Sequence, residues 1–371
     1  MILFDDIYRE SRVLITGHTG FKGSWLTTWL HKLGADIVGV SKDIPTQPSM
    51  FNELGLENKI THIFGDIRDI EFVSRIVCNT QPDYVFHLAA QAIVSKSYTD
   101  PLETITTNVI GTANVLESLR QLNKPCIAVL ITSDKCYDNL EWTWGYRETD
   151  SLGGKDIYSG SKGAAELIIK SYFHSYLADG KYLKLGIGRA GNVIGGGDWA
   201  KDRIVVDCIV AWNNGKKVEI RSPNATRPWQ HVLEPLSGYL ALGQNIYNRH
   251  NLHGEAFNFG PRSEQNRRVI DLLSDLGGYW GYTDEDKPYR IINNVQFHEA
   301  GLLKLNCDKA LQYLGWEPNL KYEETIHLVG EWYKNYYNKQ QNMYEFTLEQ
   351  IRKYESLGMS RNRIWAKDNN E

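Results

Sequence analysis

The stretch Ser11-Arg-Val-Leu-Ile-Thr-Gly17-His-Thr-Gly20-Phe-Lys-Gly23-Ser-Trp-Leu26 decides the fold of this chain. A short apolar run, Val13 to Thr16, gives way to three glycines spaced three residues apart, and apolar side chains then recur at helical spacing as far as Leu33. The pattern predicts a strand, a tight turn and a helix. Such a turn brings the backbone close to a pyrophosphate, which the free N–H groups at the helix N-terminus can bind. The spacing departs from the common G-x-G-x-x-G fingerprint, and a plain glycine-rich turn is the alternative interpretation.

Length and charge narrow the class of protein. With 371 residues the chain is long enough for two domains, or for one domain with a large lobe. Its formal net charge of -4 argues against a surface that neutralises nucleic-acid phosphates. No window approaches about 18 uncharged apolar residues, so we expect no membrane span. Residues 1–10 carry acids and no long apolar run, so we expect no signal peptide.

The cysteines indicate a reducing compartment. Their number is odd, they are scattered, and none forms a Cys-x-x-Cys pair; they are Cys78, Cys126, Cys136, Cys208 and Cys307. This usage predicts a cytoplasmic protein with neither a disulfide framework nor a metal site.

Strand and helix patterns alternate through the first half of the chain. After the first strand, strands are expected at 35–41, 60–66, 83–90, 126–133 and 182–189. Long helices are expected at 101–122 and 156–176. The alternation predicts an α/β fold with a doubly wound parallel sheet of the Rossmann type. The run 126–133 is nearly all apolar, as a parallel strand buried on both faces should be.

Two positions bear on how a dinucleotide would be held. At the end of the second strand an acid favours NAD and a basic residue favours NADP, but Ser41, Lys42 and Asp43 leave this choice open. Asp66, at the end of the third strand, can accept from an adenine amino group or cap the following helix, expected over 68–78. The two interpretations of Asp66 are equally good.

Ionisable side chains follow the fifth strand and open the second long helix. Ser133, Asp134 and Lys135 lie where a ligand in the sheet crevice would be. Tyr158 and Lys162, four residues apart, share one helix face. The ammonium is expected to lower the pKa of the phenol, which could then take a proton from a sugar hydroxyl as hydride leaves the same carbon. Tyr-x-x-x-Lys is a weak pattern alone, and a surface ion pair is the alternative for Asp134 and Lys135.

These motifs together resemble the extended short-chain dehydrogenase/reductase superfamily. The resemblance is carried by Thr16-Gly-His-Thr-Gly-Phe-Lys-Gly23, His87-Leu-Ala-Ala90, Asn108-Val-Ile-Gly-Thr112 and the Tyr158/Lys162 pair. Within it the chain is similar, over roughly residues 8 to 335, to the nucleotide-sugar 4,6-dehydratases of the NAD-dependent epimerase/dehydratase family, and among these to the ones that act on CDP-glucose. The narrower match rests on the motifs in 132–138, 141–148, 150–154, 189–199 and 227–232.

The resemblance implies a lyase that uses NAD to convert CDP-glucose to its 4-dehydro-6-deoxy derivative and water, in deoxysugar biosynthesis such as that of lipopolysaccharide O-antigen. Tyr158 would act as base on the C4 hydroxyl, and Lys162 would hold the nicotinamide ribose. Lys135 would remove the C5 proton, Asp134 would protonate the departing C6 hydroxyl, and Ser133 would bind the C4 oxygen. An amine must be neutral to act as a base, so a depressed pKa is expected for Lys135.

The resemblance also implies the binding residues. Those expected at the cofactor are Gly17, Gly20, Phe21, Lys22, Gly23, Asp66, Ile67, Leu88, Ala89, Ala90, Tyr158 and Lys162. Those expected at the substrate are Gln91, Ser133, Asn192, Arg203 and Arg227, because guanidinium groups fit phosphate oxygens. Arg189 lies at the same strand end, but a structural ion pair is its alternative role.

The expected domains follow the same resemblance. An NAD-binding domain would comprise residues 1–190 and about 230–262, and a smaller C-terminal α/β nucleotide-sugar-binding lobe about 191–229 and 263–340. Residues 341–371, rich in charge and amide, would form a polar tail with an exposed helix. The helices at 101–122 and 156–176 resemble a pair that forms a homodimer, or a dimer of dimers, in this superfamily; the alternative is that both only cover the sheet.

The sequence leaves three alternative functions open. A nucleotide-sugar 4-epimerase of the same fold needs the tyrosine and lysine but not Asp134 and Lys135, and a dehydratase of another nucleotide-sugar is a close variant. A non-enzymatic dinucleotide sensor would not need Tyr158 and Lys162. NAD is preferred over NADP because a returning hydride needs no reducing pool and no arginine follows the second strand.

Overall fold

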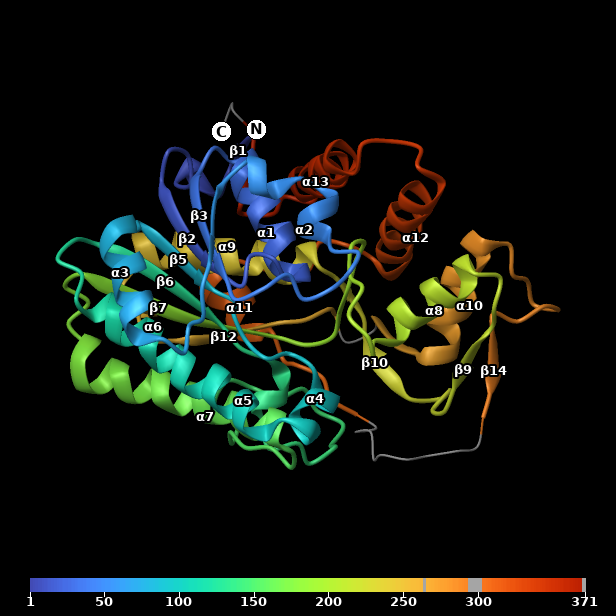
Figure 1. Cartoon of the computed structure of the whole chain (residues 1–371), viewed down its shortest axis with the longest axis horizontal. Helices are drawn as coiled ribbons and strands as arrows, with labels where there is room; N and C mark the ends of the chain where they lie inside the picture. The colour runs from blue at the N-terminus through green and yellow to red at the C-terminus, as the bar shows by residue number, and fades with distance from the viewer. Residues whose placement is uncertain (263–264, 293–301, 369–371) are drawn as a thin grey trace.

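A seven-stranded sheet forms the centre of the computed structural model, which describes residues 1–262, 265–292 and 302–368 (Figure 1). The strands lie in the order β12-β7-β6-β5-β2-β3-β4, and every neighbouring pair is parallel. Their bounds are β2 (Arg12–Thr16), β3 (Asp36–Ser41), β4 (Thr61–Phe64), β5 (Tyr84–His87), β6 (Cys126–Ile131), β7 (Leu183–Ala190) and β12 (Ala256–Phe259). The predicted doubly wound parallel sheet is confirmed.

Helices cover both faces of this sheet. On one face α3 (Ile70–Thr80), α6 (Gly111–Arg120) and α7 (Ile157–Tyr172) bury a cluster that includes Leu116 and Ile169. On the other face α1 (Phe21–Lys32) and α9 (Leu233–Asn248) bury a larger cluster that includes Trp25 and Leu240. Nearly every residue of α9 is buried, which is typical of a helix enclosed on all sides.

The helix expected at 101–122 contains a π turn. It runs as α5 (Pro101–Ile105), a π segment at Thr106–Ile110 and then α6. Asn108 lies in this π segment and is buried, and its side-chain amide donates to Ser161 Oγ on α7 over 2.9 Å. Single π turns inside α-helices are frequent at functional sites.

A smaller lobe follows β7 and carries three short sheets, of which β9, β10 and β14 are labelled on the right of Figure 1. β8 (Val193–Ile194) pairs with β11 (Gln230–His231) and β9 (Val218–Ile220) with β14 (Tyr289–Ile291), both parallel, and β10 (Thr226–Pro228) pairs with β13 (Asn266–Arg268), antiparallel. Its helices are α8 (Ile204–Asn213) and α10 (Val269–Gly277). The remaining short helices are α2 (Met50–Glu53), α4 (Val94–Thr99) and α11 (Asp308–Leu314). The exact domain boundaries remain a prediction.

The C-terminal segment is packed against the core, so the prediction of a polar tail over 341–371 is wrong for its described part, residues 341–368. Helix α12 (Tyr322–Asn338) leads to α13 (Met343–Ser360), which packs beside α1 and buries Phe346, Ile351 and Tyr354. Most charged residues of α13, namely Glu345, Glu349, Arg352 and Lys353, are exposed, while apolar residues at helical spacing are buried. Glu355 is the exception, because it is buried and pairs with Lys32 of α1.

The two ends of the chain meet. Strand β1 (Ile2–Leu3) pairs antiparallel with β15 (Ala366–Lys367), and the rings of Phe4 and Trp365 stack with their centroids 5.3 Å apart (Figure 1). No helix among the described residues is long and apolar enough to span a bilayer.

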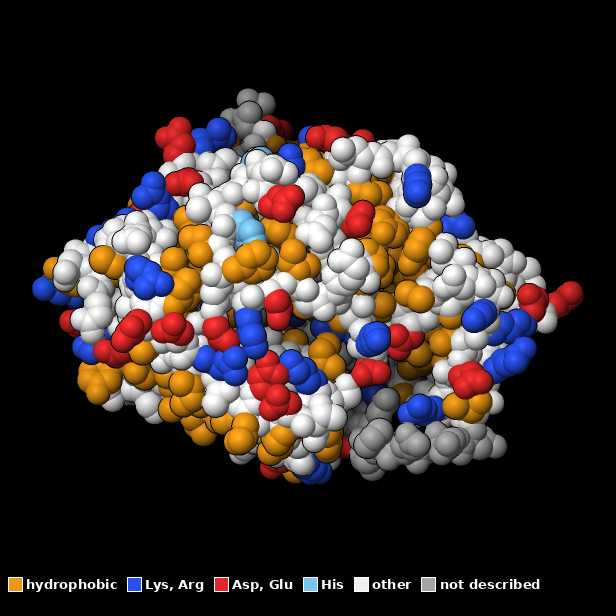
Figure 2. All heavy atoms as spheres, viewed as in Figure 1, with side chains coloured by type: hydrophobic (Ala, Val, Ile, Leu, Met, Phe, Trp, Pro, Cys, Tyr) orange, Lys and Arg blue, Asp and Glu red, His pale blue; other side chains and the backbone are white. Residues whose placement is uncertain are grey.

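Apolar side chains remain exposed along α5, along the π segment that follows it and along α7. Leu102 is 72% exposed, and Ile110 and Leu167 are about half exposed. In Figure 2 orange, hydrophobic side chains gather along the lower edge of the molecule. The helices α5 and α7 run along this same edge in Figure 1. Both helices therefore carry apolar surface in addition to the face that covers the sheet.

A fully buried ion pair joins β7 to α7. The side chains of Arg189 on β7 and Glu166 on α7 have no exposed surface, and Arg189 Nε donates to Glu166 Oε1 over 2.7 Å. The hydroxyl of Thr132, one residue beyond β6, donates to the same oxygen over 2.6 Å. Arg189 Nη1 donates to the Tyr137 hydroxyl over 2.6 Å. Of the two roles considered for Arg189, the structural ion pair is the one observed.

Replacing Glu166 tests the importance of this pair. Glu166→Gln leaves the guanidinium buried without its counter-charge, so we expect the free energy of unfolding to fall by about 3–5 kcal/mol in urea denaturation. The matched control is Glu117→Gln, which breaks a surface pair with Arg120 and should cost about 1 kcal/mol or less. A loss for Glu166→Gln no larger than that of the control would contradict the prediction.

Candidate active site

The glycine turn forms a cradle at the carboxyl end of β2. Gly17 has φ +79°, and a Cβ there would lie 2.7 Å from the backbone nitrogen of Ala89, so only glycine fits. A Cβ at Gly23 would overlap the Gly17 carbonyl. Gly20 is the N-cap of α1 and provides no capping side chain, so backbone N–H groups at this helix end are available for a phosphate. The predicted strand, turn and helix are confirmed, and they fit a dinucleotide.

The small residues after β5 line the other side of this cradle. The backbone nitrogen of Leu88 donates to the Thr16 carbonyl over 3.0 Å, and that of Ala89 donates to the Thr16 hydroxyl over 3.3 Å. On the opposite side, the Phe21 ring lies close to Gly195 in the glycine-rich loop after β7. The loops after β2, β5 and β7 therefore converge, as expected for a ligand site in an open α/β sheet.

The structure excludes one of the two interpretations of Asp66, and its contact with adenine stays a prediction. Helix α3 is capped by Asp69, which accepts from the backbone nitrogens of residues 71 and 72, so the capping role for Asp66 is wrong. Asp66 instead pairs with Arg68, whose Nη2 lies 2.6 Å from Asp66 Oδ2. The neighbouring Ile67 packs against Gly111, and its carbonyl accepts from Asn114.

The lysine at the end of β3 lies within an ion network. Lys42 Nζ is 3.1 Å from Glu103 Oε1 and 3.9 Å from Asp66 Oδ2. Glu103 also pairs with Lys96 over 2.7 Å, and hydrogen bonds from Lys96 and Lys42 lower the pKa of Glu103 to about 2. The carboxylates of Glu103 and Asp66 thus offset the positive charge of Lys42. Lys42 follows β3, where an acidic residue favours NAD and a basic residue favours NADP in dinucleotide-binding folds.

The triplet after β6 forms a tight turn at the centre of the site. Ser133 Oγ accepts from the Lys135 backbone nitrogen over 3.2 Å and donates to Asp134 Oδ1 over 2.9 Å. Ser133 and Asp134 are buried, and Lys135 is partly exposed. Burial raises the pKa of Asp134, while the nearby Lys135, Ser133 and Lys22 oppose this shift. Because Asp134 is buried, a surface ion pair between Asp134 and Lys135 is not what the structure shows.

Tyr158 and Lys162 face the same space from the first turns of α7. Asp156 caps this helix by accepting from the Ser159 backbone nitrogen over 3.0 Å. Both side chains are 7% exposed, and Lys162 Nζ lies 6.0 Å from the centroid of the Tyr158 ring. The helix and the shared face are as predicted.

The prediction that Lys162 lowers the pKa of Tyr158 is wrong. Burial raises the pKa of Tyr158 to about 12, although a hydrogen bond with Ser133 opposes the shift. Burial also lowers the pKa of Lys162 to about 8. Desolvation is the largest effect on both groups, and it disfavours the charged form of each.

Lys22 of the glycine turn reaches the same cluster. Burial lowers its pKa to about 8, and the charged groups that act on it are Arg203, Asp134, Lys162 and Asp198. It therefore lies among the catalytic candidates as well as in the cofactor turn. From the sequence, Lys22 was expected at the cofactor only.

The predicted substrate residues come both from loops of the central sheet and from the smaller lobe. Arg203 pairs with Asp198 and also acts electrostatically on Tyr158. Arg227 lies on β10 of the smaller lobe, and Asn192 lies partly exposed after β7. Gln91 is held by its own loop and by α5, because its Oε1 accepts from the Ile93 backbone nitrogen and its Nε2 donates to Thr104. Their contacts with a substrate remain predictions.

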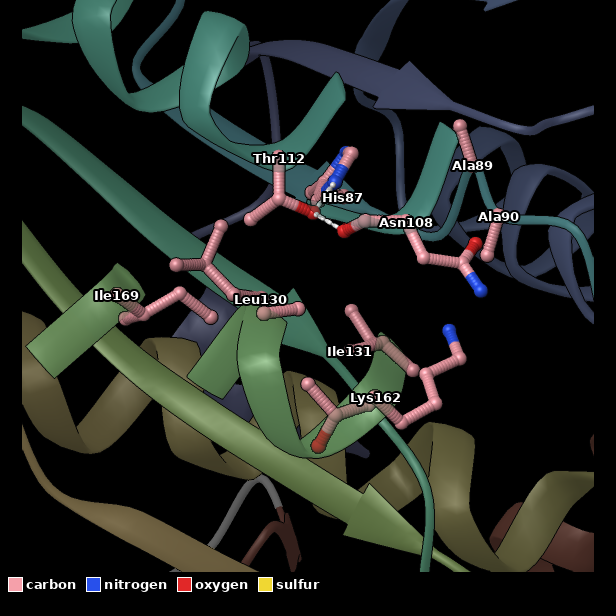
Figure 3. Close-up of a pocket in the computed structure, with 11 residues that line it drawn as sticks. His87, Ala89, Ala90, Asn108, Thr112, Leu130, Ile131, Lys162 and Ile169 are labelled. Carbon is pink, nitrogen blue, oxygen red and sulfur yellow. Dashed lines mark hydrogen bonds between the residues drawn. The ribbon is translucent and has the colours of Figure 1, made fainter. Parts of the chain in front are cut away.

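A small cavity lies behind Lys162, between α7 and the π segment. Figure 3 shows the Lys162 amine and the Asn108 amide pointing toward one another across it, with Ala89 and Ala90 at one end. His87 lies deeper, where it hydrogen-bonds the hydroxyls of Thr16 and Thr112, and burial lowers its pKa to about 3. Sequence reasoning assigned no role to Asn108, which fixes this wall of the site.

The described residues include no group of three or more His, Cys, Asp or Glu side chains that could hold a metal ion. Tyr158, Asp134 and the lysines Lys22, Lys135 and Lys162 offer acid–base chemistry beside a cradle for a dinucleotide.

Comparison with known proteins shows which family has this architecture. Residues 14–329 match the family model described as GDP-mannose 4,6 dehydratase. A CDP-glucose 4,6-dehydratase of Salmonella typhimurium is 44% identical over 333 residues, which cover 89% of this chain and 92% of that protein.

Solved structures show the same fold. The epimerase Mth375 of Methanothermobacter thermautotrophicus has a TM-score of 0.77 at 24% identity, covering 91% of this chain and 96% of that one. DesIV, a dTDP-glucose 4,6-dehydratase of Streptomyces venezuelae solved with NAD and TYD bound, has a TM-score of 0.74 at 19% identity, covering 87% and 97%. At this identity the likeness concerns the fold alone. From the family match and the 44% identity, the chain belongs to the NAD-dependent epimerase/dehydratase family, in the branch that the GDP-mannose 4,6 dehydratase model describes.

Proposed function

We propose that this chain is an NAD-dependent hydro-lyase that converts CDP-glucose to CDP-4-dehydro-6-deoxyglucose and water. The observation that carries the proposal is the convergence of Ser133, Asp134 and Lys135 with Tyr158 and Lys162 at one end of the sheet. The 44% identity to a CDP-glucose 4,6-dehydratase supports both the reaction and the nucleotide. An epimerase would have no use for a buried acid and an amine beside the tyrosine.

The cradle supports NAD as the cofactor. Gly17, Gly20 and Gly23 would receive the pyrophosphate at the N-terminus of α1, and Lys162 would hold the nicotinamide ribose. Glu103 and Asp66 beside Lys42 would repel a 2′-phosphate, which favours NAD over NADP. When bound, NAD supplies a hydride acceptor for C4 and later the same hydride for C6.

Side chains of the chain would move the protons. Tyr158 would take the proton of the C4 hydroxyl, and Ser133 would bind the C4 oxygen. The 4-keto group acidifies the C5 proton, which Lys135 would remove as a neutral amine and later return. Burial favours the protonated form of Asp134, as a general acid at the C6 hydroxyl requires.

Exposed apolar surface on α5 and α7 supports a homodimer, built from these helices of two copies. Leu102, Ile110 and Leu167 would be covered in such a dimer. Large exposed apolar patches are typical of protein–protein contacts. The proposed interface uses the outer faces of the two helices, so it is compatible with their covering the sheet.

Turnover of nucleotide-sugars tests the function directly. The chain with added NAD should produce a 4-keto-sugar from CDP-glucose, detected by its absorbance in alkali, and little from dTDP-, GDP- or UDP-glucose. Product from another nucleotide only would retain the reaction and refute the cytidine assignment. Bound cofactor without product from any of the four would refute the dehydratase and favour an epimerase or a sensor.

Two substitutions separate the proposed oxidation from the proposed elimination. Lys135→Met should lower product formation by about 10²–10⁴-fold while C4 oxidation continues, so the absorbance of reduced nicotinamide should accumulate. Tyr158→Phe should slow the appearance of reduced nicotinamide itself. Full product formation by Lys135→Met, or an unchanged oxidation rate in Tyr158→Phe, would remove that side chain from its role.

Charge placed on the apolar surface tests the dimer. The double variant Leu102→Glu, Leu167→Glu should sediment as a monomer where the native chain sediments as a dimer or tetramer. The matched control is Leu311→Glu, which puts the same charge on an exposed leucine of α11 and should leave the assembly unchanged. A double variant with native sedimentation would place the interface elsewhere.

A further inference from the structure

A hydrogen bond joins two segments of the chain that flank the site. The Ser95 hydroxyl donates to Asp202 Oδ2 over 2.6 Å, although the two residues are 107 positions apart in sequence. Ser95 lies on α4, which follows the loop that carries Gln91 after β5, and Asp202 lies just before α8 of the smaller lobe (Figure 1). The bond therefore connects a loop of the central sheet to the smaller lobe.

The residue that follows Asp202 is Arg203, a predicted substrate residue. Asp202 has φ +63°, a left-handed conformation that is uncommon outside glycine, asparagine and aspartate. Arg203 returns to φ −116° as the N-cap of α8, so the backbone changes direction sharply between the two residues. Conformations of this kind persist where surrounding contacts hold them, and the bond from Ser95 is such a contact.

The other end of this segment is anchored in the core. The Tyr333 hydroxyl donates to the Asp198 carbonyl over 2.6 Å and accepts from the Asp198 backbone nitrogen over 3.1 Å. Both residues are buried, whereas Ser95 and Asp202 are exposed to solvent. Residues 198–203 thus have one fixed end and one end whose hydrogen bond can break and form again in water.

We propose that Ser95 and Asp202 form a latch that closes the site over a bound nucleotide-sugar and so positions Arg203 at its diphosphate. When the latch is closed, Arg203 pairs with the Asp198 carboxylate and the turn at Asp202 fixes its backbone. When the latch is open, the segment 198–203 moves about its anchored end, so that substrate can enter and product can leave. The inference rests on the proposed function, and it adds two positioning residues to the site.

The place of Arg203 explains what such a latch would control. Its guanidinium acts electrostatically on Tyr158 and on Lys22 of the glycine turn, so it lies near both the catalytic side chains and the cofactor cradle. A guanidinium matches phosphate oxygens, and the phosphates of a nucleotide-sugar do not change in the proposed reaction. Binding them stabilises substrate and transition state equally, so the latch should act on KM rather than on kcat.

Loss of either partner should therefore weaken substrate binding without slowing the chemistry. With CDP-glucose and saturating NAD, Ser95→Ala and Asp202→Gly should each raise KM about three- to tenfold, the effect of losing one such hydrogen bond, with kcat within about twofold of the native value. The double variant should raise KM no further than either single variant. Ser95→Thr keeps the hydroxyl, and Asp202→Asn keeps an acceptor that tolerates the left-handed turn, so both should retain the native KM.

Two controls connect the effect to the latch. Thr99→Ala removes another exposed hydroxyl of α4, which donates to the Lys96 carbonyl over 3.1 Å within the same helix, and should leave KM unchanged. In a chain that carries Arg203→Met, KM should already be high, and Ser95→Ala should raise it no further. Additive effects in the double variant, or a further rise of KM in the Arg203→Met chain, would overturn the latch.

Hydrogen–deuterium exchange tests the latch without turnover. The backbone amides of residues 198–203 should exchange about three- to tenfold faster in Ser95→Ala than in the native chain, with no change in Thr99→Ala. Equal exchange in Ser95→Ala and the native chain would overturn the latch, whatever the activity. Absence of product from the native chain, together with faster exchange in Ser95→Ala, would instead refute the proposed function alone.

Discussion

The buried pair between Arg189 and Glu166 is the constraint on which the geometry of the site depends. Glu166 lies one turn beyond Lys162 on α7, and Thr132, which donates to the same carboxylate, directly precedes Ser133. One carboxylate therefore fixes the helix that carries the tyrosine and lysine against the strand end that carries the serine, acid and amine. Two fully desolvated charges require such close and complete hydrogen bonding, because neither could remain buried alone.

The guanidinium extends this constraint into the loop that follows. Arg189 Nη1 donates to the Tyr137 hydroxyl and to the Glu148 carbonyl, so the segment after the catalytic triplet is held at both ends. Tyr137 in turn donates to Asn258 on the neighbouring strand β12. The triplet thus projects from a rigid support built from three adjacent strands and one helix, which is the arrangement that accurate positioning of catalytic groups needs.

Much of this could be predicted from the sequence because it depends on local patterns. The glycine turn, the apolar strand runs and the helical spacing around Tyr158 each determine a short element, and the strand–helix alternation then determines a parallel sheet. The C-terminal segment was mispredicted because its high charge hid an apolar stripe on α13, whose partner α1 lies more than three hundred residues earlier in the chain. Likewise Asp66 and Asp69 are both adequate caps by residue type, and only the observed start of α3 distinguishes them.

The protonation states at the site could not be predicted from pairs of residues, because burial acts on all of them together. The sequence suggests that Lys162 should lower the pKa of Tyr158, since the two share a helix face. In the folded chain desolvation raises the pKa of Tyr158 to about 12, lowers the pKa of Lys162 to about 8 and raises that of Asp134. Each shift favours the neutral form of its group.

The neutral form suits the acid of an elimination but not the tyrosine, which has to accept a proton. In the folded chain desolvation raises the pKa of the Tyr158 phenol to about 12, so this phenol can become a base only when substrate and cofactor change the local charge around it. Tyr158 and Asp134 are both buried, so the same desolvation acts on the base and on the acid. Water-filled surroundings would instead allow each group to titrate independently. Burial of the site therefore prepares the acid in advance and leaves the base to be activated by what binds beside it.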